Sequence, residues 1–418
     1  MKKLVTTVFV VLMLAFTTAC TGTTATAPVP VGANTSADAR HILSEDDLAA
    51  CRDVLERNVP GAADQVIIVN DKTGSVADMP SPDGLAADLH RASMNDGSLT
   101  VIAVEGAGTA PRIVAKNAAL STPGPRDRPS VRRTADSMPA CVQGIFLNGT
   151  LPTAPGTDLH RAMSLAAELA GPGTTIWLLS DMLANSGPLA LNAGLLSMDP
   201  TEAAAKASST APLDLKGAAL KVAGVGNSTT SLLSPQRTWL RDFSRGLCTQ
   251  WRASGCDDIN LDPVNPERAD KNLPEDTLPP FPKITTTSTA GSCTFEVPAE
   301  LAFAKDSPVL SDGAKEALAR PLEMLLRNPA ATAKIVGHTA TVLSSPDHGV
   351  GFSERRASAT MTYLTDSGVP ASRITSRGVG DTEPKVEDID PTTGQQIDEM
   401  AAIERRVNIL IEGVPCSH

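Results

Sequence analysis

The sequence predicts an α/β protein with two folded domains: a parallel sheet covered by helices, then a smaller domain with a βαβαβ order of elements. Two patterns and the length predict this. Short apolar runs alternate with helical stretches in the first half, and such runs suit strands that are buried on both faces. A proline-rich stretch then separates the halves. The chain has 418 residues, enough for two or three domains at roughly 100–200 residues each.

The composition narrows the class of protein. Apolar residues make up 41% and charged residues 20% of the chain, as in soluble globular proteins. Aromatic residues, which can stack on bases, make up only 3%, and the net charge of -11 offers no positive surface to phosphate groups. We therefore expect no nucleic-acid partner.

The first residues predict export. Two lysines and an apolar run over residues 4–16 are typical of a signal peptide, which we expect at residues 1–19. Cys20 follows Ala19 as in bacterial lipoproteins, whose signal this segment resembles, although Thr17 stands where that signal usually has an aliphatic residue. The resemblance implies a lipid on Cys20 and a membrane-anchored, extracytoplasmic protein of the cell envelope. Plain secretion, with Cys20 incidental, is the alternative.

Changes in composition divide the rest of the chain. Residues 20–40 are rich in Thr, Ala and Pro and predict a flexible tether. Residues 41–258 carry the first domain. Six prolines and a run of threonines predict a linker over residues 259–292, and residues 293–418 form the second domain.

The first domain is expected to begin with a helix from Ser44 to about residue 57, because the Ser44 side chain can cap its first turn. A later helix is expected from about residue 159 to residue 170. Four apolar runs predict the strands of the sheet, at residues 66–69, 99–104, 176–179 and 220–225.

The second domain is expected to hold two helices and four strands. One helix covers about residues 312–327 and should kink at Pro321, which has no backbone N–H. The other has Ser353 as its cap and ends at Gly368, which can adopt the left-handed conformation that stops a helix. The strands are predicted at residues 294–297, 333–336, 373–376 and 406–411.

The cysteines agree with export. Six remain when Cys20 is set aside, an even number that suits three disulfides in an oxidising compartment. Fifteen pairings are possible for six cysteines, so the sequence does not fix them. Proximity in the sequence favours a pair between Cys248 and Cys256. A pair between Cys293 and Cys416 is favoured because these residues bracket the second domain. Cys51 and Cys141 remain. Buried free thiols are the alternative.

Polar side chains follow the predicted strands at one edge of the first sheet. Asp71, Thr73 and Ser75 come at alternate positions directly after the first predicted strand. Thr157 precedes a helix, and Asp181 comes soon after a later strand. Because ligands bind beyond the carboxyl ends of strands in open α/β sheets, these oxygen atoms can converge on one point. The alternative is a set of ordinary turn residues.

This set of residues resembles the metal-ion-dependent adhesion site of the von Willebrand factor A domain, a family with a Rossmann-like parallel sheet. That site has D-x-S/T-x-S after the first strand, a Thr in a later loop and an Asp after a central strand, and the chain matches each position. The resemblance implies that Thr73, Ser75 and Thr157 hold Mg²⁺, or Mn²⁺, through hydroxyl groups. Asp71 and Asp181 would act mostly through bound waters. A hard dication prefers such oxygen ligands, and an acidic side chain of a partner protein would complete the set.

Three features depart from that family. Asn70 stands where the family usually continues the apolar strand, and the loop over residues 106–139 is long. Residues 183–216 insert a stretch rich in Ala, Ser and Gly, which we expect as a surface loop with helical turns or as a lid over the site. A domain that has lost its metal is the alternative.

Four segments of the second domain resemble the OmpA-like peptidoglycan-binding domain, over about residues 293–413. They are IVGHT at residues 335–339, SERRA at 353–357, GVG at 378–380 and ERRV at 404–407. In that family a strand ending G-H-T-D and a helix beginning L-S-x-x-R-A bracket a pocket for the diaminopimelate side chain of the cell-wall stem peptide. The resemblance implies that Arg356 binds the carboxylate of that side chain and that Thr339 borders the pocket. Arg405 and Arg406 are expected to pair with local carboxylates or carbonyls.

The pocket lacks one family residue. Ala340 stands where the family has the Asp that holds the ammonium group of the ligand. A buried ammonium group without its partner costs roughly 2–5 kcal/mol. Asp347, in the same loop, is a candidate substitute. A domain that keeps the fold but binds the wall weakly or not at all is the alternative.

Nothing in the sequence demands an enzyme. The six histidines show no metal-ligand spacing, and the sequence has no nucleophile elbow, Walker loop or dinucleotide motif. We expect a non-enzymatic binding protein of the cell envelope, with metal-dependent binding of a protein in the first domain and peptidoglycan association in the second. A metal-dependent envelope hydrolase and a structural tether with degenerate sites are the alternatives.

Overall fold

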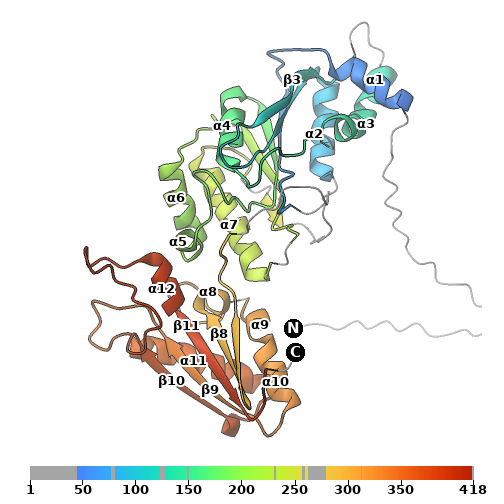
Figure 1. The fold of residues 1–418 in the computed structure, drawn as a ribbon. Coiled ribbons are helices and arrows are strands. Elements are labelled where there is room, and N and C mark those ends of the chain that lie inside the picture. The colour runs from blue at the N-terminus through green and yellow to red at the C-terminus, as the bar shows by residue number, and fades with distance from the viewer. Residues whose placement is uncertain are drawn as a thin grey trace, which may run out of the picture. The chain divides into compact units, whose positions relative to one another are not determined.

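The computed structural model describes two mixed β-sheets with their helices (Figure 1). The predicted signal peptide, Cys20, the tether and the Ser44 cap lie outside the described residues. No described helix is both long enough and apolar enough to cross a membrane. The described residues are 45–76, 81–122, 128–147, 150–229, 232–256, 259–261, 279–311 and 313–416. We call residues 45–261 the first region and residues 279–416 the second region.

The sheet of the first region has six strands in the order β3-β2-β1-β4-β5-β6. Its strands are β1 (Gln65–Asn70), β2 (Ser98–Ala103), β3 (Arg112–Ala119), β4 (Thr174–Leu179), β5 (Ala219–Val225) and β6 (Ile259–Leu261). All neighbouring pairs are parallel except β2 and β3, which are antiparallel. The four strands predicted from apolar runs are confirmed, but the sheet is mixed and not wholly parallel.

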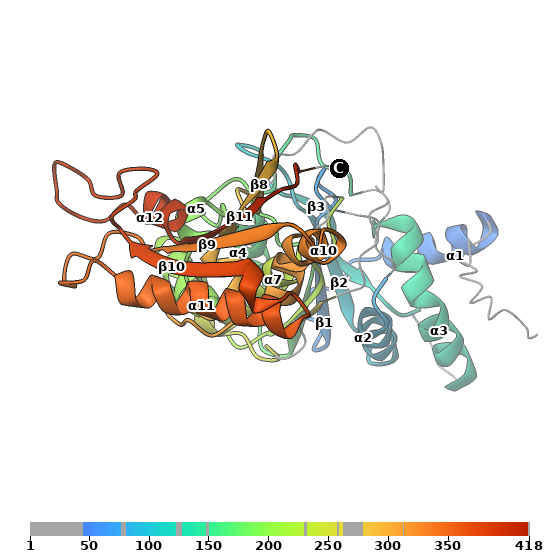
Figure 2. The same ribbon diagram turned by 90° about the horizontal axis from the view of Figure 1, so that it is seen from below.

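Helices cover both faces of this sheet, because alternate residues of each central strand point to opposite sides. Val66 and Ile68 of β1 share a core with α1, α2 and α3, whereas Ile67 and Val69 share another with α4, α6 and α7. Figure 2 shows α2 and α3 together beside β1 and β2. The helices are α1 (Glu45–Leu55), α2 (Asp83–Met94), α3 (Arg128–Ile145), α4 (Leu159–Leu169), α5 (Ala193–Leu196), α6 (Pro200–Thr210) and α7 (Ser234–Gln250).

Two stretches that were predicted as loops contain helices and, in one case, a strand, so these predictions are wrong. Residues 106–139 hold β3 and much of α3, and β3 escapes a search for apolar runs because it is an edge strand whose first half is largely exposed. Residues 183–216 hold α5 and α6, and Leu189, Leu191 and Ala204 of this stretch are buried in the core. The stretch is therefore part of the packed domain and not a surface loop.

The sheet of the second region has five strands in the order β10-β9-β11-β8-β7. They are β7 (Thr285–Thr289), β8 (Ser292–Pro298), β9 (Thr332–His338), β10 (Ile374–Gly380) and β11 (Arg406–Glu412). Only β9 and β10 are parallel. The four predicted strands are confirmed. The structure adds β7, and like β6 it lies inside the range predicted as a linker; every residue of β7 is exposed, so no apolar pattern marks it.

The helices of the second region correct two details. The predicted kink at Pro321 is a break at Leu318 between α9 and α10, because the proline ring has no room beside the carbonyl of Ala317. Ser353 is not a cap: α11 begins three residues earlier, after Gly349 in the left-handed conformation (φ 73°). The helices are α8 (Ala299–Ala302), α9 (Ala314–Ala317), α10 (Ala319–Arg327), α11 (Val350–Asp366) and α12 (Asp398–Glu404), with a short 3-10 helix at Ala371–Arg373.

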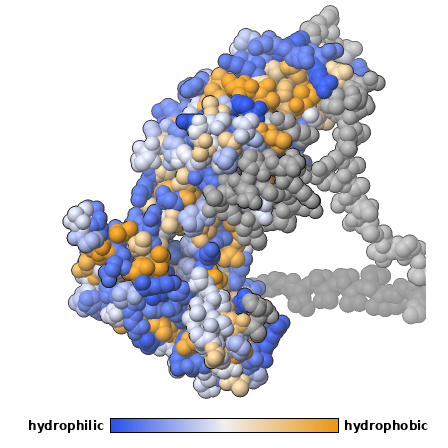
Figure 3. Space-filling view, in the orientation of Figure 1, coloured by the Kyte–Doolittle hydropathy of each residue, from blue (hydrophilic) through white to orange (hydrophobic). Residues whose placement is uncertain are grey.

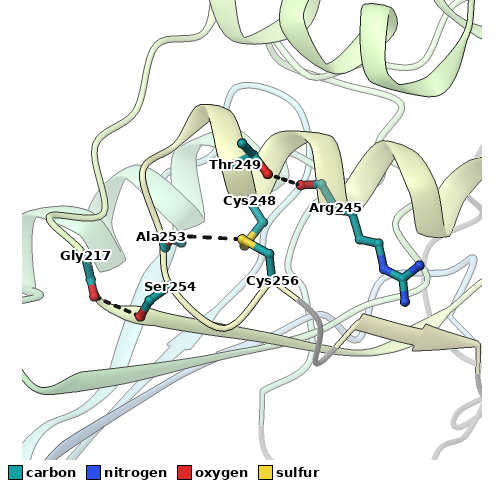
Figure 4. The surroundings of a disulfide bond; sticks show 7 residues. All are labelled: Gly217, Arg245, Cys248, Thr249, Ala253, Ser254 and Cys256. Carbon is teal, nitrogen blue, oxygen red and sulfur yellow. Dashed lines mark hydrogen bonds between the residues drawn. A yellow bond between two sulfur atoms is a disulfide. The ribbon is translucent and has the colours of Figure 1, made fainter.

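Three disulfides join the favoured cysteine pairs. Cys51–Cys141 links α1 to α3, and Cys293–Cys416 links β8 to the segment after β11. Cys248–Cys256 ties the end of α7 to the segment that follows it (Figure 4). The pairing predicted from proximity and from domain bounds is confirmed.

The surface is mainly hydrophilic on the face that Figure 3 shows, with smaller hydrophobic groups between. Among the large apolar side chains of the described residues, Leu343 (74%) and Val309 (63%) are the most exposed. Both belong to loops of the second region.

Candidate functional site

The predicted oxygen cluster lies where the strand order of the first sheet reverses. The chain runs from β1 outward to β2 and β3, then returns to β4 on the other side of β1. Ligands of open α/β sheets bind at such a point, beyond the carboxyl ends of the strands. The backbone N–H of Asp71 donates to the carbonyl of Leu179 at 2.9 Å, so the ends of β1 and β4 are held together there.

Hydrogen bonds join side chains from three segments at this point. The carboxylate of Asp71 accepts from Thr73 Oγ1 at 2.6 Å and from Ser180 Oγ at 2.6 Å. Thr73 Oγ1 lies 2.6 Å from Thr157 Oγ1. All four residues are buried, with at most 1% exposed. The structure thus brings Asp71, Thr73 and Thr157 into direct contact.

Ser75 and Asp181 lie on the same segments. Ser75 is 3% exposed, and its carbonyl accepts from the backbone of Thr229 at 2.8 Å. Among the residues that the structure describes, none makes a hydrogen bond to the Ser75 hydroxyl. Asp181 is fully buried, and its Oδ1 accepts from the backbone of Leu183 at 3.0 Å.

Two residues of this cluster were not predicted as part of the site. Ser180 binds Asp71 as described above, and Asn185 Oδ1 accepts from the backbone N–H of Thr157 at 2.8 Å. Ser180 could have been predicted as a site residue, because it directly follows the buried strand β4 and precedes Asp181. Asn185 gave no signal, because its partner is 28 residues away.

Two buried polar residues hold the segment that leads to Thr157. Asn70 Nδ2 donates to the carbonyl of Leu147 at 3.1 Å and to the hydroxyl of Thr150. Glu105 accepts from the backbone of Thr153 at 2.7 Å and from Arg112 Nε at 2.6 Å. Burial by itself raises the pKa of Glu105, but these hydrogen bonds lower it by more, so the pKa lies below its usual value. Asn70 therefore positions a loop of the site.

The donor set suits a hard dication. Hydroxyl and carboxylate oxygens are the ligands that Mg²⁺ prefers, and a buried hydroxyl such as that of Ser75 is destabilising unless something pairs with it. Within the described residues, no group of three or more His, Cys, Asp or Glu side chains could hold a metal ion. A metal at the oxygen cluster would therefore depend on its hydroxyl groups.

The second predicted site is centred on Arg356 of α11. The residue is 5% exposed, and its guanidinium lies 4.4 Å from the ring centre of Phe352 and 5.2 Å from that of Phe303. Its Nε donates to the carbonyl of Ser307 at 3.1 Å. Burial lowers the pKa of Arg356 to about 10, so the side chain is still a cation at neutral pH.

The loop after β9 holds the other predicted residues. Thr339 is 6% exposed, and no described residue makes a hydrogen bond to its hydroxyl. Asp347 is exposed, and its carboxylate accepts from the hydroxyl of Ser345 and from the backbone of Gly349 (3.2 Å) and Gly351 (3.0 Å). These hydrogen bonds, that of Ser345 first, lower the pKa of Asp347. Asp347 thus caps the start of α11.

Arg405, directly after α12, and Arg406, the first residue of β11, pair with carboxylates as predicted. Arg406 Nη1 donates to Glu404 Oε2 at 2.7 Å, and Arg405 Nε donates to Glu300 Oε1 at 3.2 Å. Beside them, burial and then the charge of Arg406 lower the pKa of His338 to about 4. His338 is therefore neutral at pH 7.

Comparison with known sequences settles the kind of domain. Residues 302–397 match the OmpA family. This part of the chain is an OmpA-like domain. Outer membrane protein A of Escherichia fergusonii is 31% identical to the chain over 86 residues, which cover 19% of this chain and 33% of that protein. Outer membrane protein A of Escherichia coli O157:H7 is also 31% identical over 86 residues, with 23% of that protein covered. The chain thus spans a third or less of these relatives.

Solved structures similar to the OmpA-like domain include a MotB-like protein of Desulfovibrio vulgaris, 25% identical over 31% of this chain and 81% of that chain, with a TM-score of 0.27. Another is the cell wall anchor of the type VI secretion system of Pseudomonas aeruginosa, 22% identical over 31% of this chain and 87% of that chain, with a TM-score of 0.27.

Proposed function

We propose that the chain is a non-enzymatic binding protein of the cell envelope whose OmpA-like domain, within residues 293–418, associates with peptidoglycan. The observation that carries the proposal is the buried cation of Arg356 in a domain that matches the OmpA family. Within the described residues, the two Nη groups of Arg356 make no hydrogen bond. A planar guanidinium with such donors can bind a carboxylate through paired hydrogen bonds.

Arg356→Ala tests this proposal. We expect the affinity of the full chain for a diaminopimelate-containing stem peptide to fall at least about 30-fold, because loss of one partner of a buried charge pair costs about 2–5 kcal/mol. Calorimetric titration measures the affinity. Arg355→Ala is the matched control, since it removes the same charge from an exposed neighbour.

A second probe avoids the risk that Arg356→Ala perturbs the fold. A stem peptide with lysine in place of diaminopimelate lacks the side-chain carboxylate. The wild-type chain should bind it about as weakly as Arg356→Ala binds the diaminopimelate peptide. Tight binding that survives Arg356→Ala would place the ligand elsewhere and overturn the proposal.

We further propose that residues 41–258 bind a protein partner through Mg²⁺, or Mn²⁺, held by the oxygen cluster. Thr73, Ser75 and Thr157 would hold the ion through hydroxyls, with Asp71 and Asp181 acting through waters. The bound ion would supply an electrophilic centre for an acidic side chain of the partner. The buried Ser75 hydroxyl without a hydrogen-bond partner among the described residues supports this proposal.

Calorimetry of the full chain with Mg²⁺ tests the metal site. Binding should raise the thermal midpoint by mass action, and Asp71→Ala should abolish both the binding heat and the shift. Asp136→Ala, which removes a carboxylate from the exposed surface of α3, should change neither. No binding heat at millimolar Mg²⁺ would leave the cluster a polar loop. Turnover of envelope substrates by the loaded protein would instead favour the hydrolase.

The anchor is a separate proposal. A lipid on Cys20 would hold the protein at the membrane, so Cys20→Ser should release it from the membrane fraction with its thermal midpoint unchanged. Mass spectrometry of the mature amino terminus measures the modification. An unmodified terminus downstream of Cys20 would contradict it.

A further inference from the structure

The proposed wall-binding pocket lacks an anion where its relatives carry one. The side chain of diaminopimelate ends in a carboxylate and an ammonium group on the same carbon, so a cation alone recognises only half of it. Ala340 offers no charge. The carboxylate of Asp347 already accepts hydrogen bonds from the hydroxyl of Ser345 and from backbone N–H groups at the start of α11.

A different loop brings a carboxylate to Arg356. Phe303 contributes a ring face to the guanidinium, and the carbonyl of Ser307 accepts its Nε–H at 3.1 Å. Asp306 directly precedes Ser307 and is exposed. Its backbone has φ 46°, a left-handed conformation that few residues other than glycine adopt and that aspartate tolerates. The turn therefore places the exposed Asp306 next to Ser307, whose carbonyl oxygen accepts the hydrogen bond from Arg356.

Two carboxylates, those of Glu300 and Asp306, act on the charge of Arg356, and they differ in whether a ligand can use them. Burial lowers the pKa of Arg356, and the charges of Glu300 and Asp306, in that order, oppose the effect. Glu300 pairs with Arg405 through Oε1, which lies 3.2 Å from Arg405 Nε, and its side chain is only 20% exposed. Its Oε2 is buried and has no hydrogen-bond partner among the described residues. The carboxylate of Asp306 makes no hydrogen bond or ion pair with any residue that the structure describes. Asp306 is the acid near Arg356 that is still available to a ligand.

We propose that Asp306 takes the role that Ala340 has lost, and binds the side-chain ammonium of diaminopimelate while Arg356 binds the adjacent carboxylate. This inference rests on the proposed peptidoglycan association. The buried hydroxyl of Thr339, which lacks a hydrogen-bond partner among the described residues, supplies a further polar group in the loop that carries Ala340.

The test compares two stem peptides on the full chain by calorimetric titration, one with free diaminopimelate and one with its side-chain amine acetylated. The wild-type chain should prefer the free amine about tenfold, a ratio equivalent to one charge-assisted pair. Asp306→Asn, an isosteric change at an exposed position, should remove this preference and bind both peptides alike. Asp347→Asn is the matched control and should leave the preference intact.

A rescue variant separates a ligand contact from a structural effect. Ala340→Asp returns the family residue, so Asp306→Asn with Ala340→Asp should regain the preference for the free amine. If Asp306→Asn keeps the preference while Arg356→Ala abolishes binding, the inference is wrong and the proposed function stands. If Asp347→Asn removes the preference instead, the anion is Asp347. If Arg356→Ala changes nothing, the proposed function itself fails.

Discussion

The two candidate sites are held in place in different ways. In the first region, hydrogen bonds between side chains of separate loops fix Asp71, Thr73, Thr157 and Ser180 to one another. In the second region, contacts with two aromatic rings hold Arg356, and within the described residues only its Nε donates a hydrogen bond. A network of hydrogen bonds positions several oxygen atoms at once, as a metal site requires, whereas a stacked guanidinium keeps its outer donors for a ligand.

This difference predicts different weaknesses. The oxygen cluster depends on loops that are themselves held by buried polar residues, so it should fail when one hydrogen bond is removed. The arginine site depends on the core of a small domain, so it should fail when that core is loosened. The following experiments test this contrast, from the largest expected effect to the smallest.

The disulfide of the second region should have the largest effect on stability. Cys293 and Cys416 are 123 residues apart, and a loop of that length corresponds to about 5 kcal/mol in the chain-entropy account. Replacing both by Ser should lower the urea midpoint of the full chain more than replacing Cys248 and Cys256, whose separation of 8 corresponds to about 2.5 kcal/mol. Equal effects of the two double variants would contradict the entropic account.

Acid should weaken the second region before the first. His338 has a pKa of about 4 in the fold against an ordinary 6.5. Its contribution to the free energy of unfolding is therefore complete above pH 6.5 and is lost as the pH falls towards 4. The loss is roughly 1.4 kcal/mol per pH unit, or about 3 kcal/mol in all. The pKa of Glu105 is lowered from its ordinary 4.5, so its contribution to the free energy of unfolding should be lost only as the pH falls below 4.5.

His338→Gln checks this order. The variant should show a flatter dependence of the unfolding midpoint on pH between 6.5 and 4 than the wild-type chain. His348→Gln, at an exposed histidine of the same region, is the control. An unchanged slope in His338→Gln would mean that another group carries the acid sensitivity.

Asn70→Leu should damage the first site through its loop. The change removes the hydrogen bonds that Asn70 Nδ2 donates to the carbonyl of Leu147 and to the hydroxyl of Thr150, each worth about 0.5–1.5 kcal/mol, while that carbonyl keeps its hydrogen bond from Thr150 Oγ1 at 3.0 Å. We expect a lower thermal midpoint and weaker Mg²⁺ binding, while affinity for the stem peptide is unchanged. Intact Mg²⁺ binding in a folded Asn70→Leu chain would show that the loop does not need this support.

Ser75→Ala should have the smallest effect on stability. Removing a buried hydroxyl that lacks a hydrogen bond within the described residues should leave the free energy of unfolding of the metal-free chain unchanged or raise it by up to about 1 kcal/mol. The same change should reduce Mg²⁺ affinity, because a proposed ligand is gone. Thr150→Ala, which removes a hydroxyl that is bonded to Asn70, is the comparison and should destabilise the chain. A clear loss of metal-free stability in Ser75→Ala would show that its hydroxyl is paired within the protein.

Burial decided which strands the sequence could reveal. The residues of β2 and β4 are all buried, so both strands appear as apolar runs. The residues of β7 are all exposed, and only two of the eight residues of β3, at the sheet edge, are buried, so neither strand has an apolar signature. Their pairing depends on neighbouring strands and not on their own side chains.

The sequence by itself determined the α/β class, the buried strands and the residues that match the OmpA family, and it favoured the cysteine pairs without fixing them. The tertiary structure decided which of these residues touch. Ser180 meets Asp71 across 109 residues, and Arg356 meets Ser307 across 49, because sheet order and helix packing bring distant segments together. A spacing rule describes neighbours on one strand or helix. It cannot report a contact between two loops, so the sequence pointed to Asp347, in the same loop as Ala340, whereas the fold brought Ser307, the neighbour of Asp306, into contact with Arg356.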